Sequence, residues 1–145
     1  MDLLDNSIFD LPLFSIKNIK CLGRIVDVYD GDTITFVFIL NNQLQKHKLR
    51  LYGINSPELK GTTHNMGLAA RNFLLSQIID KDLDLNKEYK KDEIITMLKN
   101  TKKLFTFELF GEEKYGRILG KIYNNNECIN DLMILHGFAN EYLLK

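Results

Sequence analysis

The 145-residue chain has no long hydrophobic run, no net charge and only two cysteines, Cys21 and Cys128. Because no apolar run approaches the ~20 residues that a membrane span needs, the sequence predicts no transmembrane helix. The two cysteines have no metal-ligand spacing, which favours reduced thiols over a disulfide framework. The balance of 19 basic and 19 acidic residues disfavours non-specific binding of polyanions but is compatible with a local basic cleft.

The N-terminal stretch MDLLDNSIFDLPLF is apolar and acidic and contains no lysine or arginine. A secretory signal begins with a basic region, so this stretch is not expected to be one, and a compartment inside the cell is favoured. Two roles stay open for it: packing on the domain, which is the preferred interpretation, or docking to a partner. The length suits a single domain. We assign 1–19 to an N-terminal extension and 20–145 to the domain.

Alternation of apolar and polar residues predicts five strands. They cover residues 23–28, 33–38, 46–54, 104–110 and 118–123. Asn41 and Asn42 are typical of a hairpin turn between the second and third, because asparagine tolerates positive φ. The first three strands therefore form an antiparallel meander.

Helical segments are expected after the third strand and after the fifth. The buried stripe of the first is predicted to consist of Met66, Ala69, Ala70, Phe73, Leu74, Gln77 and Ile78. The mixed-charge connection at about 81–103 is interpreted as a solvated insertion with one short helix, for which Asp92 is a candidate cap. Asn130 is expected to cap the last helix and Gly137 to end it. This order predicts a mainly β, α+β fold, a five-stranded barrel of the oligonucleotide-binding (OB) type.

Four places have charged or polar side chains that neither a strand nor a turn requires. They are Asp30 with Asp32, Arg50, the stretch NSPE from Asn55 to Glu58, and Arg117. Each has a purely structural explanation by itself, such as a turn or a helix cap. Hard divalent cations such as calcium prefer oxygen ligands. Asp32, the Asn55 side chain and a carbonyl near Ser56 supply three, and a water held by Asp30 adds another.

The remaining charged residues, Arg50, Arg117 and Glu58, suit the binding and hydrolysis of a phosphate ester. Arg50 and Arg117 are able to grip a phosphate bidentately and to neutralise the charge that it gains when it becomes five-coordinate. A carboxylate such as Glu58 orients or deprotonates an attacking water. Metal, base and two guanidiniums together are what phosphodiester hydrolysis needs. Glu113, in the turn before Arg117, is interpreted as a surface charge.

The pattern DGDT … RLYGINSPE … KYGR … GFA resembles the staphylococcal nuclease (thermonuclease-like) family over about residues 23–142. The resemblance implies a barrel with three helices and a calcium-dependent endonuclease, a hydrolase acting on DNA and RNA with little sequence preference. Its products are expected to have 3′-phosphate ends, because the 5′ oxygen leaves. The resemblance matches Asp32 to a metal-binding aspartate and Asp30 to the acid two residues before it. It matches Ser56 to a residue whose backbone carbonyl completes the calcium site.

By the same resemblance, Arg50 and Arg117 contact the scissile phosphate, and Glu58 acts as general base or positions the water. The candidate substrate-binding residues are Thr33, Tyr115 and Tyr142. For Tyr142, packing at the rim is an equal alternative. The expected ligands are one Ca²⁺ ion and a DNA or RNA substrate, with no membrane contact, and the expected state is a monomer.

The sequence departs from the family pattern in three ways. Asn55 stands where the best-known member has a second metal-binding aspartate, so weaker calcium binding is expected. The 81–103 connection is longer, and the neutral net charge predicts slower capture of nucleic acid than by a basic protein. Two alternatives to an enzyme remain: a catalytically inactive module that binds nucleic acid or protein, and an adaptor that uses the N-terminal extension.

Overall fold

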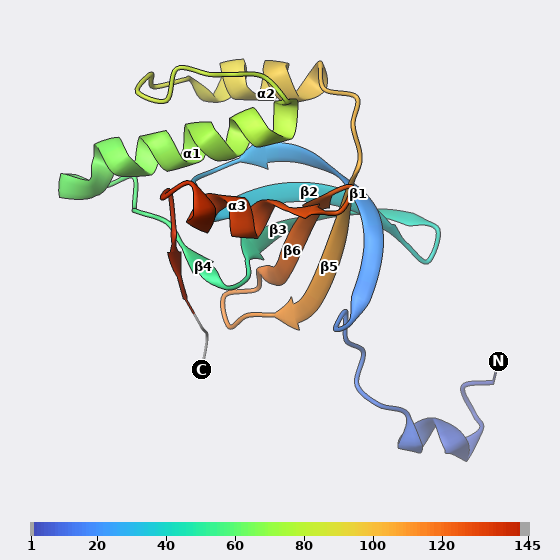
Figure 1. The fold of residues 1–145 in the computed structure, drawn as a ribbon. Helices are drawn as coiled ribbons and strands as arrows, with labels where there is room; N and C mark the ends of the chain where they lie inside the picture. The colour runs from blue at the N-terminus through green and yellow to red at the C-terminus, as the bar shows by residue number, and fades with distance from the viewer. Residues whose placement is uncertain (1, 143–145) are drawn as a thin grey trace.

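The computed structural model describes residues 2–142 and confirms the mainly β barrel (Figure 1). The long strands are β1 (Ile19–Val28), β2 (Thr33–Leu40), β3 (Gln43–Leu51), β5 (Phe105–Glu112) and β6 (Ile118–Asn124). The short ones are β4 (Ile54–Asn55), β7 (Glu127–Cys128) and β8 (Asn140–Glu141). The long strands follow the order β3-β2-β1-β5-β6, and a parallel pairing of β3 with β6 closes the barrel.

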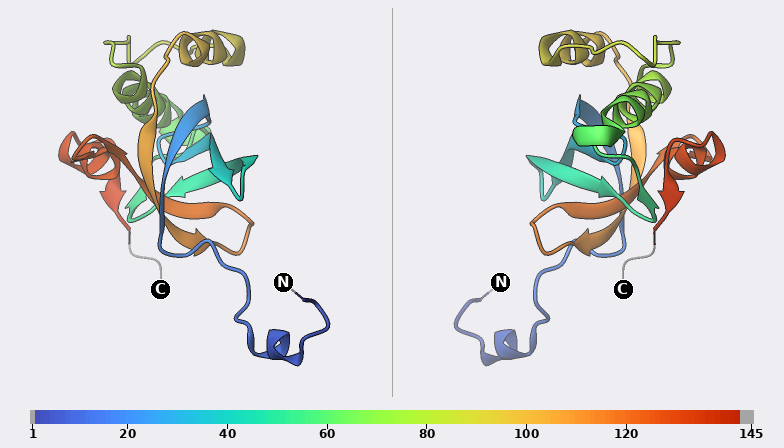
Figure 2. Two further views of the ribbon diagram at one scale, coloured as in Figure 1. Left: turned by 90° about the vertical axis from the view of Figure 1, so that its right-hand side faces the viewer. Right: turned by 90° about the vertical axis from the view of Figure 1, so that its left-hand side faces the viewer.

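Among the described residues, three α-helices and two short 3₁₀ helices join or flank the strands. They are η1 (Asn6–Asp10), η2 (Gly61–Thr63), α1 (His64–Ile79), α2 (Lys91–Lys99) and α3 (Ile129–Leu135). Figures 1 and 2 show α1 and α2 on the same side of the barrel, whereas α3 packs beside β6. Within residues 2–142, no helix combines the length and the apolar character that crossing a membrane requires.

The barrel interior is filled by the apolar residues of the alternating strand pattern. Phe36 and Phe107 are fully buried and stack with their ring centroids 4.5 Å apart. Burying a side chain of this size contributes about 1.5–3 kcal/mol. The predicted turn between β2 and β3 is confirmed, since Asn41 and Asn42 have φ values of 53° and 65°. Gly137, with φ 80°, follows the end of α3 as expected.

The buried face of α1 differs from the predicted stripe. Met66 is exposed, while the polar side chain of Asn72 is fully buried. Asn72 lies against the connection that follows the helix, and its Nδ2 donates to the carbonyls of Asp84, Leu85 and Lys87 at 3.3, 3.0 and 2.8 Å. The helix is therefore covered by the barrel and by this connection, so a single apolar stripe does not describe it.

The connection is held by packing as well as by Asn72. Helix α2 within it buries Ile94 and Leu98. The predicted cap Asp92 is wrong, because the helix begins after Lys90, whose N–H donates to Glu93 Oε1 at 3.1 Å. Asp92 lies in the first turn, where a carboxylate suits the positive end of the helix dipole. The predicted short helix is therefore confirmed, but the connection is not solvated throughout, because Tyr89, Ile94 and Leu98 are buried.

Asn130 does not cap α3, because Cys128 is the capping residue and Asn130 lies within the helix. Its side chain is buried and joins three segments of backbone. Oδ1 accepts from Ile122 N at 3.1 Å, and Nδ2 donates to the carbonyls of Tyr52 and Gly120 at 2.9 and 3.1 Å. The side chain thus satisfies buried main-chain groups of β6 and of the segment that leaves β3.

The N-terminal segment from residue 2 to residue 14 extends away from the barrel (Figure 1). Its large apolar side chains Leu3, Leu4, Phe9, Leu11, Leu13 and Phe14 are 69% to 95% exposed. Helix η1 buries none of its residues, and Ile16 is the first buried residue of the described chain. The expectation that this segment packs on its own domain is therefore wrong.

Candidate active site

The turn between β1 and β2 is a compact loop around two acids. The backbone N–H of Asp32 donates to Oδ1 of Asp30 at 3.0 Å. Between them, a Cβ on Gly31 would lie 2.7 Å from Cβ of Ser56 and 2.8 Å from Cβ of Ala70. Only glycine fits there, because the segment after β4 and helix α1 both press against the turn.

The Asp32 carboxylate is almost buried, with 6% of the residue exposed, and three elements hold it. Oδ2 accepts from the backbone N–H of Ser56 at 2.9 Å and lies 3.4 Å from Nη1 of Arg50. Oδ1 accepts from the Thr33 hydroxyl at 3.2 Å. The folded barrel therefore fixes the direction in which this carboxylate points.

Arg50 is positioned by strand register and by its own hydrogen bonds. It pairs with Thr33 across β2 and β3, which places it next to Asp32. Nη1 donates to the carbonyl of Leu51 at 3.0 Å, and Nη2 donates to Oδ1 of Asn55 at 3.3 Å. The guanidinium consequently lies between the Asp32 carboxylate and the Asn55 amide.

Arg117 is held by Glu113, which makes the surface-charge interpretation of Glu113 wrong. The Glu113 side chain is 13% exposed. Its two oxygens accept from Nε and Nη2 of Arg117, each at 3.1 Å, and Oε1 also accepts from the Arg117 backbone N–H at 3.0 Å. These bonds lower the pKa of Glu113 and raise that of Arg117, so the pair stays ionised. The four-residue spacing of the acid and the arginine was the sequence signal for this pair.

Thr33 links Arg117 to the Asp32 carboxylate that Arg50 contacts. Nη1 of Arg117, the nitrogen that Glu113 does not bind, is 3.5 Å from the Thr33 hydroxyl. The parallel pairing of β3 with β6, in which Arg50 is opposite Leu119, brings the start of β6 alongside Arg50. Of the residues predicted from the sequence, the structure brings together Asp30, Asp32, Thr33, Arg50, Asn55, Ser56 and Arg117.

Glu58 lies on the loop after β4, and its side chain is exposed. Its main chain is fixed, because its carbonyl accepts from the Thr63 hydroxyl at 2.8 Å and a Cβ on Gly67 would lie 2.5 Å from the same oxygen. Among residues 2–142, no hydrogen bond or ion pair joins the Glu58 carboxylate to the two arginines. The fold thus anchors the backbone of Glu58 while leaving its carboxylate in solvent.

The two tyrosines differ in their relation to the site. The Tyr115 ring is 72% exposed, and its centroid lies 5.9 Å from Cζ of Arg117. Tyr142 is also exposed, and its backbone N–H donates to the carbonyl of Gly53 at 2.8 Å. Within the part of the chain that the structure describes, no ring contact links Tyr142 to either arginine. Tyr115 is therefore the aromatic residue that borders the site.

The donors at the β1–β2 turn are all oxygens: two carboxylates, the Asn55 amide and the Thr33 hydroxyl. Burial and then the charge of Asp32 raise the pKa of the Asp30 carboxyl well above its ordinary value. Beside them, the Ser56 hydroxyl is buried without a hydrogen-bond partner among residues 2–142. No group of three histidine, cysteine, aspartate or glutamate residues suited to a metal occurs in the described chain. A cation here must therefore also use amide and carbonyl oxygens, which is a donor set that fits calcium.

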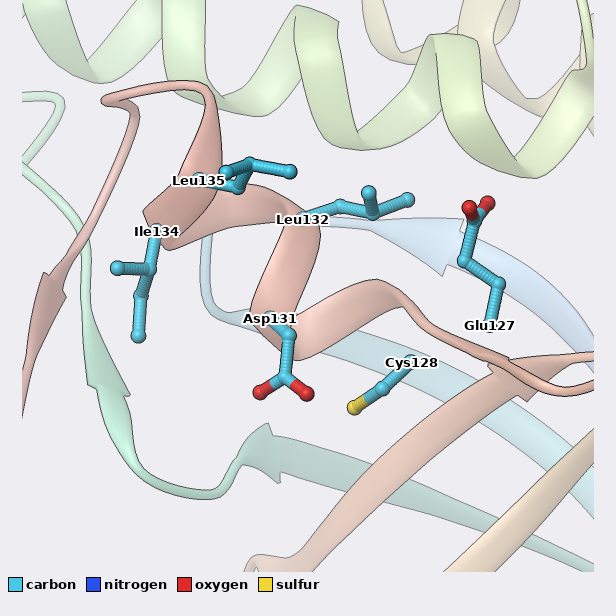
Figure 3. Close-up of a pocket in the computed structure, with 6 residues that line it drawn as sticks. All are labelled: Glu127, Cys128, Asp131, Leu132, Ile134 and Leu135. Atoms are coloured by element: carbon cyan, nitrogen blue, oxygen red, sulfur yellow. The ribbon is translucent and has the colours of Figure 1, made fainter.

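A separate pocket of 410 Å³ lies along α3 (Figure 3). It is lined by Glu127, Cys128, Asp131, Leu132, Ile134 and Leu135, none of which belongs to the site described above. Burial raises the pKa of the Cys128 thiol, which argues against a reactive thiolate. This pocket therefore offers no competing nucleophile.

The fold and the site define a small barrel of the oligonucleotide-binding type with paired arginines and carboxylates at one end. Residues 48–145 match the family model of staphylococcal nuclease homologues, and the chain belongs to this family. It is 28% identical over 139 residues to an uncharacterized protein of Bacillus anthracis, in an alignment covering 91% of this chain and 54% of that protein. The chain thus spans about half the length of the curated relative. The matched range includes both arginines, while Asp30, Asp32 and Thr33 precede it.

Proposed function

We propose that the protein is a calcium-dependent nuclease that hydrolyses phosphodiester bonds of DNA and RNA. The observation that supports it most is the series of contacts from Arg50 through Asp32 and Thr33 to Arg117, which groups a buried carboxylate with two oriented guanidiniums. Membership of the staphylococcal nuclease homologues supports the class of reaction. The all-oxygen donor set supports calcium as the ion.

In this proposal the arginines bind the scissile phosphate. Arg117 uses the Nη1 side of its guanidinium, because Glu113 occupies Nε and one edge of Nη2. Arg50 approaches from β3 and stabilises the charge that the phosphate gains during attack. A calcium ion held by Asp32, Asn55 and the Ser56 carbonyl, with Asp30 acting through a water, would supply further charge stabilisation.

Glu58 is the proposed general base or water-positioning residue, since it is an exposed carboxylate on a fixed backbone two residues after Ser56. Water attacks phosphorus in line with the departing 5′ oxygen, which leaves a 3′-phosphate end. Tyr115 offers a ring on which a base stacks beside Arg117. Because the protein contacts the nucleic acid mainly through its phosphate groups, which are the same in every sequence, sequence preference is weak.

The proposal is tested with a quenched fluorescent single-stranded DNA. We expect cleavage that requires calcium, stops on chelation and is lost in Asp32→Asn and Glu58→Ala. Glu127→Ala, which removes an exposed glutamate on β7, serves as the matched control and keeps its activity. If the folded protein cleaves neither DNA nor RNA with calcium, magnesium or manganese, the nuclease proposal fails. Retained binding of the oligonucleotide in that case would identify an inactive binding module.

Replacing Asn55 with aspartate is expected to tighten calcium binding about tenfold or more, because it adds a full negative charge next to Asp32. The Asn55 oxygen already faces the site, where it accepts from Arg50 at 3.3 Å. Isothermal titration with calcium measures the change, and Asn126→Asp adds the same charge at an exposed turn as a control. An unchanged affinity in Asn55→Asp would remove residue 55 from the proposed ligand set.

A further inference from the structure

The outer face of the barrel has an apolar groove at the end of β1 and β2 away from the candidate active site. It has a volume of 660 Å³, and its most exposed walls are Leu22, Ile39, Leu44 and Leu104, which are 57% to 75% exposed. A smaller groove of 270 Å³ between β1 and α2 adjoins it through the shared residues Arg24 and Val26. Clustered exposed apolar side chains of this kind mark a surface that binds another polypeptide.

The charges along the two grooves all have one sign. Arg24, Lys46 and Lys99 contribute to the lining, and no aspartate or glutamate does. The Arg24 guanidinium is fixed by the carbonyl of Lys99, to which Nη2 donates at 3.1 Å. The continuous groove therefore fits a partner segment that is apolar and acidic.

The chain itself contains such a segment at residues 2–14. It holds Asp2, Asp5 and Asp10, and no lysine or arginine occurs before Lys17. Its six large apolar side chains are exposed, as described above. They could therefore cover the exposed apolar side chains of the groove. Charge sign and apolar character thus match between the two surfaces.

The point where this segment leaves the barrel favours an intermolecular contact. Ile16 is buried, and the N–H of Asn18 donates to the carbonyl of Leu109 at 2.8 Å. From this anchor the segment runs outward, away from the barrel, in both views of Figure 2. It is therefore presented to another molecule rather than laid along its own β1.

We propose that residues 2–14 of one copy dock in the groove of a second copy, and that two copies exchange these segments reciprocally. Such an exchange gives a closed dimer with twofold symmetry. The groove surrounds the Gly23–Phe38 pairing of β1 with β2, whereas the acids follow the Val28–Ile34 pairing at the opposite end. Both candidate active sites stay open in the dimer. The proposal differs from the monomer expected from sequence, and it does not depend on nuclease activity.

The test is a charge exchange measured by sedimentation on the full-length chain. One variant, Lys46→Glu with Lys99→Glu, makes the groove acidic. The other, Asp2→Lys with Asp10→Lys, makes the segment basic and keeps the Asp5 side chain, which caps η1. The side chains of Lys46 and Lys99 are exposed and make no hydrogen bond or ion pair within residues 2–142, so both proteins should fold, which thermal melting verifies.

We expect the unaltered chain to dimerise in the micromolar range. Each variant alone should dissociate at least about tenfold more readily, because like charges then face each other. An equimolar mixture of the two variants should recover the dimer, since every segment again meets a groove of opposite charge. A monomeric unaltered chain, variants that dimerise unchanged, or a mixture that fails to recover would each overturn the proposal.

Discussion

The Arg117→Ala variant is expected to lose about 10²–10³-fold in kcat on single-stranded DNA, which is the usual cost of removing one preorganised donor to developing negative charge. The preorganisation is visible in the structure. Two parallel bonds of 3.1 Å to Glu113 fix the plane of the guanidinium, and Nη1 is left facing Thr33. Single-turnover cleavage in saturating calcium measures the effect on the chemical step without product release.

Two neighbouring variants separate the role of Arg117 from that of local charge. Lys114→Ala removes an exposed cation three residues earlier and should leave kcat unchanged. Glu113→Gln keeps the shape but cannot accept two charge-assisted bonds, so we expect an intermediate loss of about 10–100-fold, as is usual for a positioning partner. If Arg117→Ala loses no more activity than Lys114→Ala, Arg117 does not stabilise the transition state.

The strands were predictable because a barrel wall imposes a simple physical rule. One face of each strand meets the interior and the other meets solvent, so apolar residues alternate, as they do from Ile34 to Phe38. The hairpin at Asn41 and Asn42 was predictable for a similar reason, because few residues accept positive φ. In both cases the determinant is local and therefore visible in a short stretch of sequence.

The buried polar side chains were not predictable, because their partners are distant in sequence. Asn72 bonds carbonyls 12 to 15 residues later, and Asn130 reaches the carbonyl of Tyr52, 78 residues earlier. From sequence alone, Asn72 lay outside the predicted apolar stripe and Asn130 suited a helix cap. Only the packed fold shows that both asparagines form hydrogen bonds with backbone groups of segments that pack against them.

In the candidate site, too, some residues were predictable from the sequence and others were not. Asp32, Arg50 and Arg117 were identified as residue types that suit a metal and a phosphate, and the structure places them together. The contribution of Glu113 was missed, because a glutamate in a turn usually lies in solvent. Its partner is local, because Arg117 closes the same turn four residues later, so the spacing of the two residues was the signal that could have identified the pair.

Replacing Asn130 with alanine is expected to lower the free energy of unfolding by about 3–5 kcal/mol. The substitution leaves two backbone groups without their partner, and each such group costs about 1–3 kcal/mol. The two groups are the N–H of Ile122 and the carbonyl of Tyr52, because the carbonyl of Gly120 still accepts from the N–H of Tyr52 at 2.8 Å. Urea unfolding gives the change directly, and the melting temperature should fall by about 10 °C. Asn126→Ala, at an exposed turn, should change stability by less than about 0.5 kcal/mol.

The Asn130→Asp variant distinguishes the acceptor role of the side-chain oxygen from the donor role of the side-chain nitrogen. The carboxylate still accepts from Ile122, but it cannot donate to Tyr52 and Gly120 and would repel their carbonyl oxygens. We therefore expect Asn130→Asp to be at least as unstable as Asn130→Ala. Tyr52 follows Arg50 by two residues and Gly120 follows Arg117 by three, so this linkage also holds the two arginine-bearing segments together. A loss below about 1 kcal/mol in Asn130→Ala would mean that water replaces the amide and that the arginines are aligned by the parallel pairing of β3 with β6 alone.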